Sequence, residues 1–194
     1  MENRLQKNNI YLTIKNELFK YRYIIILILI LAIGFSVRLV NISEIPGGLN
    51  QDEASAGYEA YSILNYGIDR NGNTNPVQFV AWGSGQNVLY SYIMIPFIKI
   101  FGLTEFSVRL PMAIVGCISL FVFYLLLNKF TNKKIALLGI FFLAICPWHV
   151  MKSRWGLESN LFPDLILWGT YFILEGVKGK RKYCLYIASV IYGI

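Results

Sequence analysis

The sequence predicts an all-α, polytopic membrane helix bundle with an outer loop that carries short juxtamembrane amphipathic helices. Of the 194 residues, 56% are hydrophobic and only 15% are charged, and the apolar residues form continuous blocks. Several of these blocks approach the ~20 residues that a helix needs to cross ~30 Å of hydrocarbon. The basic residues cluster between the blocks, which is typical of membrane orientation, so we expect a lipid bilayer and no nucleic acid as partner.

The N-terminal part predicts a cytoplasmic arm over residues 1–20 and a first span over residues 21–40. The arm is polar and basic, whereas the span is rich in Ile and Leu over residues 24–37. The apolar run is too long for the core of a cleavable signal and lacks a small-residue cleavage site, so we expect it to remain as an anchor.

Further spans are predicted at residues 108–127, 135–150 and 161–177, and an incomplete one at residues 183–194. The chain stops inside this last apolar run, so we expect it to be the N-terminal part of a longer protein. The three cysteines show no disulfide or metal-binding spacing.

The apolar run at residues 87–102 decides the topology. It is shorter than a comfortable span and contains Pro96 and Lys99. If it crossed the membrane, the basic residues would divide equally, nine inside and nine outside. If it does not cross, twelve of the eighteen are cytoplasmic, namely Arg4, Lys7, Lys15, Lys20, Arg22, Lys129, Lys133, Lys134, Lys178, Lys180, Arg181 and Lys182.

The positive-inside rule therefore favours a re-entrant or interfacial segment at residues 87–102. The loops at residues 41–107 and 151–160 then share the outer face, and the N-terminus lies in the cytoplasm. We expect an integral multi-pass protein of the plasma (inner) membrane.

The first outer loop contains a short predicted helix with two acidic residues at its start. Apolar residues at Ala54, Tyr58, Tyr61 and Leu64 predict an amphipathic helix over residues 54–65. Asp52 and Glu53 precede it, where they can cap the helix and complement its dipole. A carboxylate at the water–lipid boundary can also accept a proton from an incoming hydroxyl or amine. The two roles are compatible.

Two further residues of this region are candidates for ligand binding. Trp82 begins a Gly-rich stretch and can stack on a sugar ring, although an interfacial aromatic residue has the same position. Arg109 lies at the mouth of a span, where it suits a phosphate group or an ion pair with Glu105. Residues 69–76 are dense in turn formers and predict a loop tip.

The second outer loop brings Arg154, Glu158 and Asn160 close in sequence, so their side chains can converge. Arg154 and Glu158 stand four residues apart, which also fits a structural ion pair. His149, at the end of a predicted span, is expected to be an interfacial polar group.

Three stretches together resemble the N-terminal part of the GT-C membrane glycosyltransferases. They are PGGLNQDEASAGYEAYSILNYGIDRNG, FGLTEFSVRLPMAIVG and CPWHVMKSRWGLESN, and the resemblance covers roughly residues 20–194. The closest group is the family 39 class, which includes protein O-mannosyltransferases and lipid A aminoarabinose transferases.

The resemblance implies a polyprenyl-phosphate sugar donor, a glycan, lipid or protein acceptor on the outer face, and inverting transfer. Asp52 matches the catalytic aspartate, Glu53 its acidic neighbour and Arg109 the arginine that opens a span. We expect Asp52 and Glu53 to be catalytic, Arg109 and Arg154 to bind the donor phosphate, and Trp82, Glu158 and Asn160 to bind substrate. The second loop has no D-x-D or E-x-D, so the sequence supports neither a divalent metal nor another cofactor.

Three alternatives stay open. One is a non-catalytic transporter or scaffold, which predicts buried charges or broken helices within the spans. Another is an oligosaccharide transferase, which requires the missing second acidic motif. The last is an inactive fragment with the same fold.

Overall fold

A computed structural model describes residues 2–81, 84–179 and 181–193, and the side chains of residues 21–80, 85–179 and 181–193. Trp82 lies outside the described residues. The described residues form eight helices and one two-stranded antiparallel sheet, which establishes the predicted all-α membrane helix bundle. Five helices make up the bundle: α1 (Glu2–Leu39), α4 (Glu105–Phe130), α5 (Lys133–Ile145), α7 (Glu158–Lys178) and α8 (Tyr183–Gly193).

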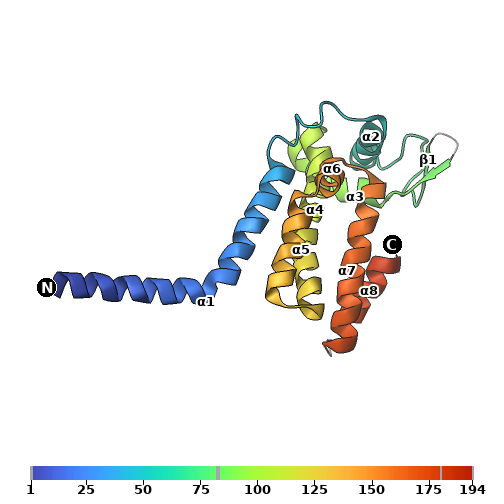
Figure 1. Ribbon diagram of the computed structural model, residues 1–194. Helices are drawn as coiled ribbons and strands as arrows, with labels where there is room; N and C mark the ends of the chain where they lie inside the picture. Colours follow the sequence, from blue (N-terminus) through green and yellow to red (C-terminus); the bar gives the residue numbers. More distant parts are fainter. Residues whose placement is uncertain (1, 82–83, 180, 194) are drawn as a thin grey trace.

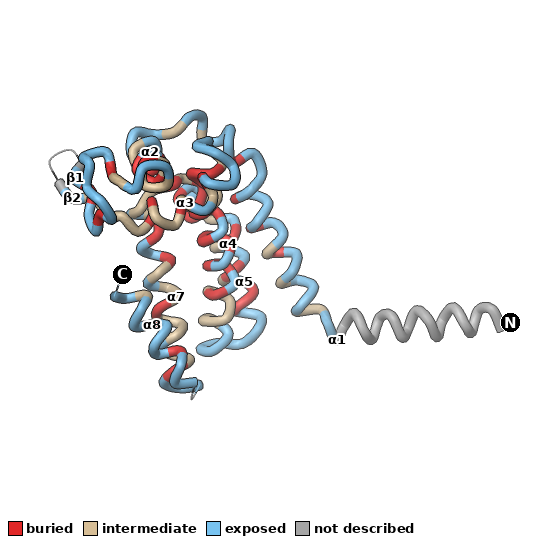
Figure 2. Tube along the Cα trace, turned by 180° about the vertical axis from the view of Figure 1, so that it is seen from behind, coloured by how far each residue is buried: buried red, intermediate tan, exposed pale blue. Residues whose placement is uncertain are grey.

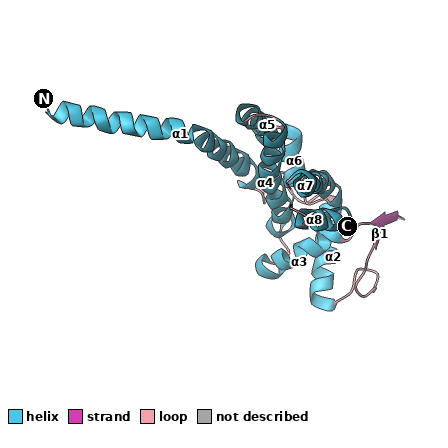
Figure 3. Ribbon diagram, turned by 90° about the horizontal axis from the view of Figure 1, so that it is seen from below, coloured by secondary structure: helices cyan, strands magenta, loops and turns pink. Residues whose placement is uncertain are grey.

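The remaining elements gather at one end of the bundle and are called the cap here (Figure 1). The cap consists of α2 (Gln51–Tyr66), α3 (Leu89–Phe101), α6 (Pro147–Arg154) and the hairpin of β1 (Phe79–Ala81) with β2 (Ser84–Gln86). Seen along the bundle, α2 and α3 lie across its end rather than along it (Figure 3). Both predicted outer loops contribute to this cap.

Two described helices are long and apolar enough to cross a membrane, Tyr21–Leu39 of α1 and all of α4. A third crossing is added if α5 and α6, which are bent by 57° at Cys146, form one broken span. The predicted span at residues 135–150 thus consists of two helices that meet at a bend, and its crossing of the membrane stays a prediction. Pro147 explains the break, because it has no N–H to continue α5 but fits the first position of a new helix.

Two predicted segments are helices that do not meet the same test of length and apolarity. The 21-residue α7 covers the predicted span at residues 161–177 but is more polar than α4 and the Tyr21–Leu39 part of α1. The 13-residue α3 covers the run at residues 87–102 and is about 20 Å long, too short to cross ~30 Å of hydrocarbon.

The predicted helix in the first outer loop is confirmed as α2. Tyr61 and Leu64 of the predicted apolar pattern are partly buried, but the most buried positions of the helix are other, smaller residues. Ala56, Gly57 and Ala60 are buried, whereas Tyr58 is exposed. The helix packs on α3 and α4 through small residues, because these allow a close approach of the backbones. Figure 2 shows that burial is concentrated where α2, α3 and α4 meet.

The cap core and the bundle core are separate clusters. The cap core lies between α2, α3, α4 and α7 and includes Tyr90, Met94, Met112 and Leu161. The bundle core lies between α1, α4 and α5 and includes Ile30, Leu120, Leu137, Ile140 and Ala144.

We predict that Gly116→Ala lowers the free energy of unfolding of the detergent-solubilised protein by about 1–3 kcal/mol, and hence its unfolding temperature. A Cβ at Gly116 would lie 2.6 Å from the Ser153 Cβ, so α4 and α6 would have to move apart. Gly47→Ala is the matched control, because a Cβ there meets nothing within 4 Å. Equal unfolding temperatures for the two variants would contradict this close packing.

Candidate functional site

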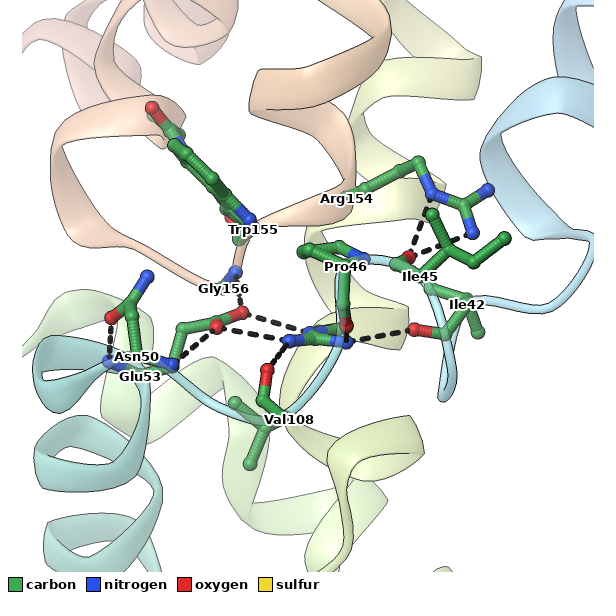
Figure 4. A network of polar contacts seen from close by, with 12 residues as sticks. Ile42, Ile45, Pro46, Asn50, Glu53, Val108, Arg154, Trp155 and Gly156 are labelled. Carbon is green, nitrogen blue, oxygen red and sulfur yellow. Dashed lines mark hydrogen bonds and ion pairs between the residues drawn. The ribbon is translucent and has the colours of Figure 1, made fainter.

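A fully buried ion pair between Glu53 and Arg109 lies at the centre of the cap (Figure 4). Arg109 donates from Nε to Glu53 Oε1 over 3.0 Å and from Nη2 to Oε2 over 3.2 Å. Glu53 Oε1 also accepts from the Gly156 N–H over 2.8 Å. The carboxylate thus joins α2, α4 and the turn after α6.

Glu53 also completes the start of α2. Its backbone N–H donates to the Asn50 side chain, and its Oε2 accepts from the Asn50 N–H, which is a capping box. The capping role considered for this acidic pair is therefore carried out by Glu53, while its expected catalytic role has no free carboxylate oxygen to support it.

The remaining N–H groups of the Arg109 guanidinium hold the loop before α2. Nη1 donates to the carbonyls of Ile42 over 3.1 Å and Pro46 over 2.7 Å, and Nη2 donates to the Gly48 carbonyl. With the two bonds to Glu53, all five N–H groups of Arg109 have protein acceptors. No N–H is left for a phosphate, and the alternative pair with Glu105 does not occur among the described residues.

Arg154 has a similar role at the end of α1. It donates to the carbonyls of Val37, Val40, Asn41 and Ile45 over 2.8–3.0 Å. The last carbonyls of a helix lack intrahelical partners, so a cationic side chain there both satisfies them and complements the helix dipole. Arg154 ties α6 to α1 and is engaged by protein groups, and the described residues contain no ion pair between it and Glu158.

Asp52 has the opposite environment from its neighbour. Its side chain is exposed and has no partner among the described residues. Successive residues of a helix point about 100° apart, so burial of Glu53 turns Asp52 towards solvent. Asp52 is the carboxylate of this pair that remains free to accept a proton.

Glu158 begins α7 and lies near Asp52. Burial raises the pKa of Glu158, and the negative charge of Asp52 raises that pKa further, against the lowering effect of hydrogen bonds from Asn87 and Gln86. One oxygen of Glu158, Oε2, is buried without a hydrogen-bond partner among the described residues. The cap therefore places acidic groups from both predicted outer loops close together.

A cleft with a volume of about 290 Å³ opens beside Glu158. Three of its lining residues are polar, namely Asn87, Glu158 and Ser159, and most of the others are apolar side chains of α3, α7 and α8. The apolar part is lined by Leu89, Leu161, Phe162, Leu165, Ile166 and Ile191. This combination suits an amphiphile with a polar head and a hydrocarbon tail.

Asn160 supports the loop between α6 and α7 rather than facing open space. Its side chain donates to the Trp155 carbonyl over 3.2 Å, and its carbonyl accepts from Lys152 over 3.1 Å. Among the described residues, no three His, Cys, Asp or Glu side chains lie close enough together to hold a metal ion.

The sequence did not predict a second buried polar cluster at the bend between α5 and α6. Arg38 donates to His149 Nδ1 over 2.8 Å and to the carbonyls of Leu143 and Ala144. Asp164 lies 3.6 Å from His149 Nε2 and accepts from Lys152 over 2.6 Å. His149 is thus buried rather than interfacial. The sequence signal for this cluster was the presence of charged residues beside apolar runs.

Broken helices and buried charges are the features that the transporter alternative predicts. Both occur here, at Cys146 and around Asp164. Asp164 is paired with Lys152 and His149, however, and the Nη atoms of Arg38 donate to the carbonyls freed by the break, so these charges have a structural role at the bend.

The fold and the cap define a membrane helix bundle with an acidic site at one end. The model of the dolichyl-phosphate-mannose-protein mannosyltransferase family matches residues 86–194, more than half of the chain. The chain belongs to this family, and it is therefore a membrane glycosyltransferase of the GT-C type. No curated protein and no solved structure matches it.

We predict that Glu53→Gln lowers the free energy of unfolding by about 3–5 kcal/mol, because it leaves the Arg109 charge buried without a counter-charge. Asp52→Asn, one residue away, should change it by less than about 0.5 kcal/mol, because that side chain is exposed and has no partner. Thermal unfolding in detergent measures both. Equal destabilisation by the two substitutions would contradict the division of roles.

The raised pKa of Glu158 predicts a pH-dependent effect of Glu158→Gln. A carboxyl group whose pKa is higher in the folded than in the unfolded state destabilises the fold when it is ionised, above that folded pKa. The variant should therefore unfold at a higher temperature than the wild type in alkaline buffer, and the difference should shrink as the pH falls towards 4. A difference that is independent of pH would contradict this assignment.

Proposed function

We propose that the protein transfers a sugar from a polyprenyl-phosphate donor to an acceptor on the outer face of the membrane, with Asp52 as the general base. The observation that carries this proposal is an exposed carboxylate, Asp52, whose charge acts on Glu158 in the lining of a mainly apolar cleft. The family match covers the cleft but begins at residue 86, so the role of Asp52 rests on this geometry and on the resemblance of residues 46–72.

The chemistry follows from the leaving group. A sugar phosphodiester is already activated, so the acceptor oxygen or nitrogen attacks the anomeric carbon while the bond to the phosphate oxygen breaks. The acceptor loses its proton to Asp52, and the polyprenyl phosphate leaves with the bonding electrons. Attack opposite to the leaving group inverts the anomeric configuration.

The donor is proposed to lie in the cleft with its polyprenyl chain against α3, α7 and α8. Its phosphate then meets the first turn of α7, whose N-cap, Leu157, offers no side-chain cap to the backbone N–H groups. Arg109 and Arg154 are assigned the structural role of fixing the cap around this site.

We propose that the cap faces the outer side of the membrane, with α3 interfacial and the N-terminus in the cytoplasm. Contacts such as Glu53 to Gly156 support one shared face for the two loops. The basic residues around positions 129–134 and 178–182 belong to the opposite end of the bundle. A plasma-membrane location agrees with this arrangement.

We predict that Asp52→Ala and Asp52→Asn abolish sugar transfer in membranes containing the full-length protein, with normal expression and unfolding temperature. Glu44→Ala is the control, because Glu44 is an exposed acidic residue of the same loop. Mass spectrometry of lipids that co-purify with Asp52→Asn should show a polyprenyl-phosphate sugar, because removal of the base leaves the cleft intact. Retained transfer would refute the role of Asp52, and the absence of such a lipid would refute the donor class.

A further inference from the structure

A groove between α1 and α5 lies away from the acidic site. Its volume is about 400 Å³. Three side chains of α1 and four of α5 line it, and they are Tyr23, Ile26, Ile30, Lys134, Leu137, Leu138 and Phe141. Apart from Lys134 and the Tyr23 hydroxyl, the walls are hydrocarbon.

The groove exists because α1 and α5 contact each other only over part of their length. Arg38 and Gly34 hold the C-terminal end of α1 against Ala144, close to the cap. From there the two helices diverge towards the other end of the bundle (Figure 1). The groove lies in this fork and spans about 10 Å along the helices, from the level of Tyr23 to that of Ile30.

The surroundings of the groove identify what covers it. One wall belongs to Tyr21–Leu39, a helix long and apolar enough to cross a membrane, and only 17% of its most apolar stretch is buried inside the protein. On the other wall, Leu138 and Phe141 are exposed. A groove at the side of a membrane span opens into the hydrocarbon of the bilayer, so acyl chains are the groups that can fill it.

The basic residues at one end of the groove determine which lipid headgroup it favours. Lys134 is exposed and has no acid partner among the described residues, and Lys133 is exposed beside it. The Tyr23 hydroxyl, which accepts from Arg22 over 3.0 Å, also lines the groove. Basic residues at the membrane surface attract anionic headgroups, with a contribution of about fivefold in affinity for each charge.

We propose that the groove between α1 and α5 binds one acyl chain of an anionic phospholipid whose phosphate contacts Lys134. The site belongs to the leaflet opposite the cap, because α5 runs from Lys134 to its contact with Arg38 at the cap end. The lipid is therefore distinct from a sugar donor in the cleft, and the proposal does not depend on the proposed transfer reaction.

The test uses the full-length protein in nanodiscs that contain equal amounts of phosphatidylglycerol and phosphatidylcholine, followed by native mass spectrometry of the released protein. We expect the wild type to retain phosphatidylglycerol preferentially. Lys134→Gln should reduce the retained phosphatidylglycerol about fivefold. Lys99→Gln, at an exposed lysine of α3 in the cap, is the matched control and should leave retention unchanged.

A second variant tests the groove itself. Leu138→Trp fills the apolar part from an exposed position, so it should displace retained lipid without lowering the unfolding temperature. Wild-type retention by both Lys134→Gln and Leu138→Trp would overturn the proposal. The proposal would also be overturned if Leu138→Trp displaced a polyprenyl phosphate or a second copy of the chain instead of phosphatidylglycerol.

Discussion

The buried ion pair between Glu53 and Arg109 is the constraint on which the cap depends. Each partner of this pair is inaccessible to water, so each charge requires the other, and the remaining lone pairs and N–H groups require backbone partners. Those partners come from the loop at residues 42–48, from the start of α2 and from Gly156. Segments more than a hundred residues apart are thereby fixed around one carboxylate. Arg154 adds a second junction, with carbonyls at the end of α1 and in the segment that follows it.

This arrangement separates structure from chemistry within the charged residues of the cap. Two arginines and one glutamate that would suit catalysis by their residue types are engaged by the protein itself. Of the acidic groups at the site, Asp52 is exposed and Glu158 lines the cleft in a half-buried position. The buried cluster around Asp164 is likewise engaged by protein groups. It lies at the bend between α5 and α6, where Arg38 donates to the carbonyls that the break exposes. At these two places, buried charged side chains therefore form hydrogen bonds with backbone groups where helices begin, end or break.

The sequence predicted the helices well, but it did not predict which residues contact one another. Long apolar runs and turn formers are local signals, so the helical membrane bundle and the existence of α2 follow from them. The identity of the buried face of α2 does not, because it depends on α3 and α4, which accept small residues rather than the aromatic ones. The partners of Arg109 and Arg154 were also out of reach. Spacing favoured acids four residues away, whereas the fold supplies Glu53 and a series of backbone carbonyls.

The adjacency of Asp52 and Glu53 has a consequence for how the site tolerates change. The anchored glutamate and the free aspartate share one helical turn, so any shift of register in that turn rotates both by about 100° and exchanges their surroundings. The capping box between Asn50 and Glu53 holds this register, so an insertion or deletion between residues 50 and 53 would displace both acidic residues. The direction in which Asp52 points is thus set by the anchored glutamate beside it.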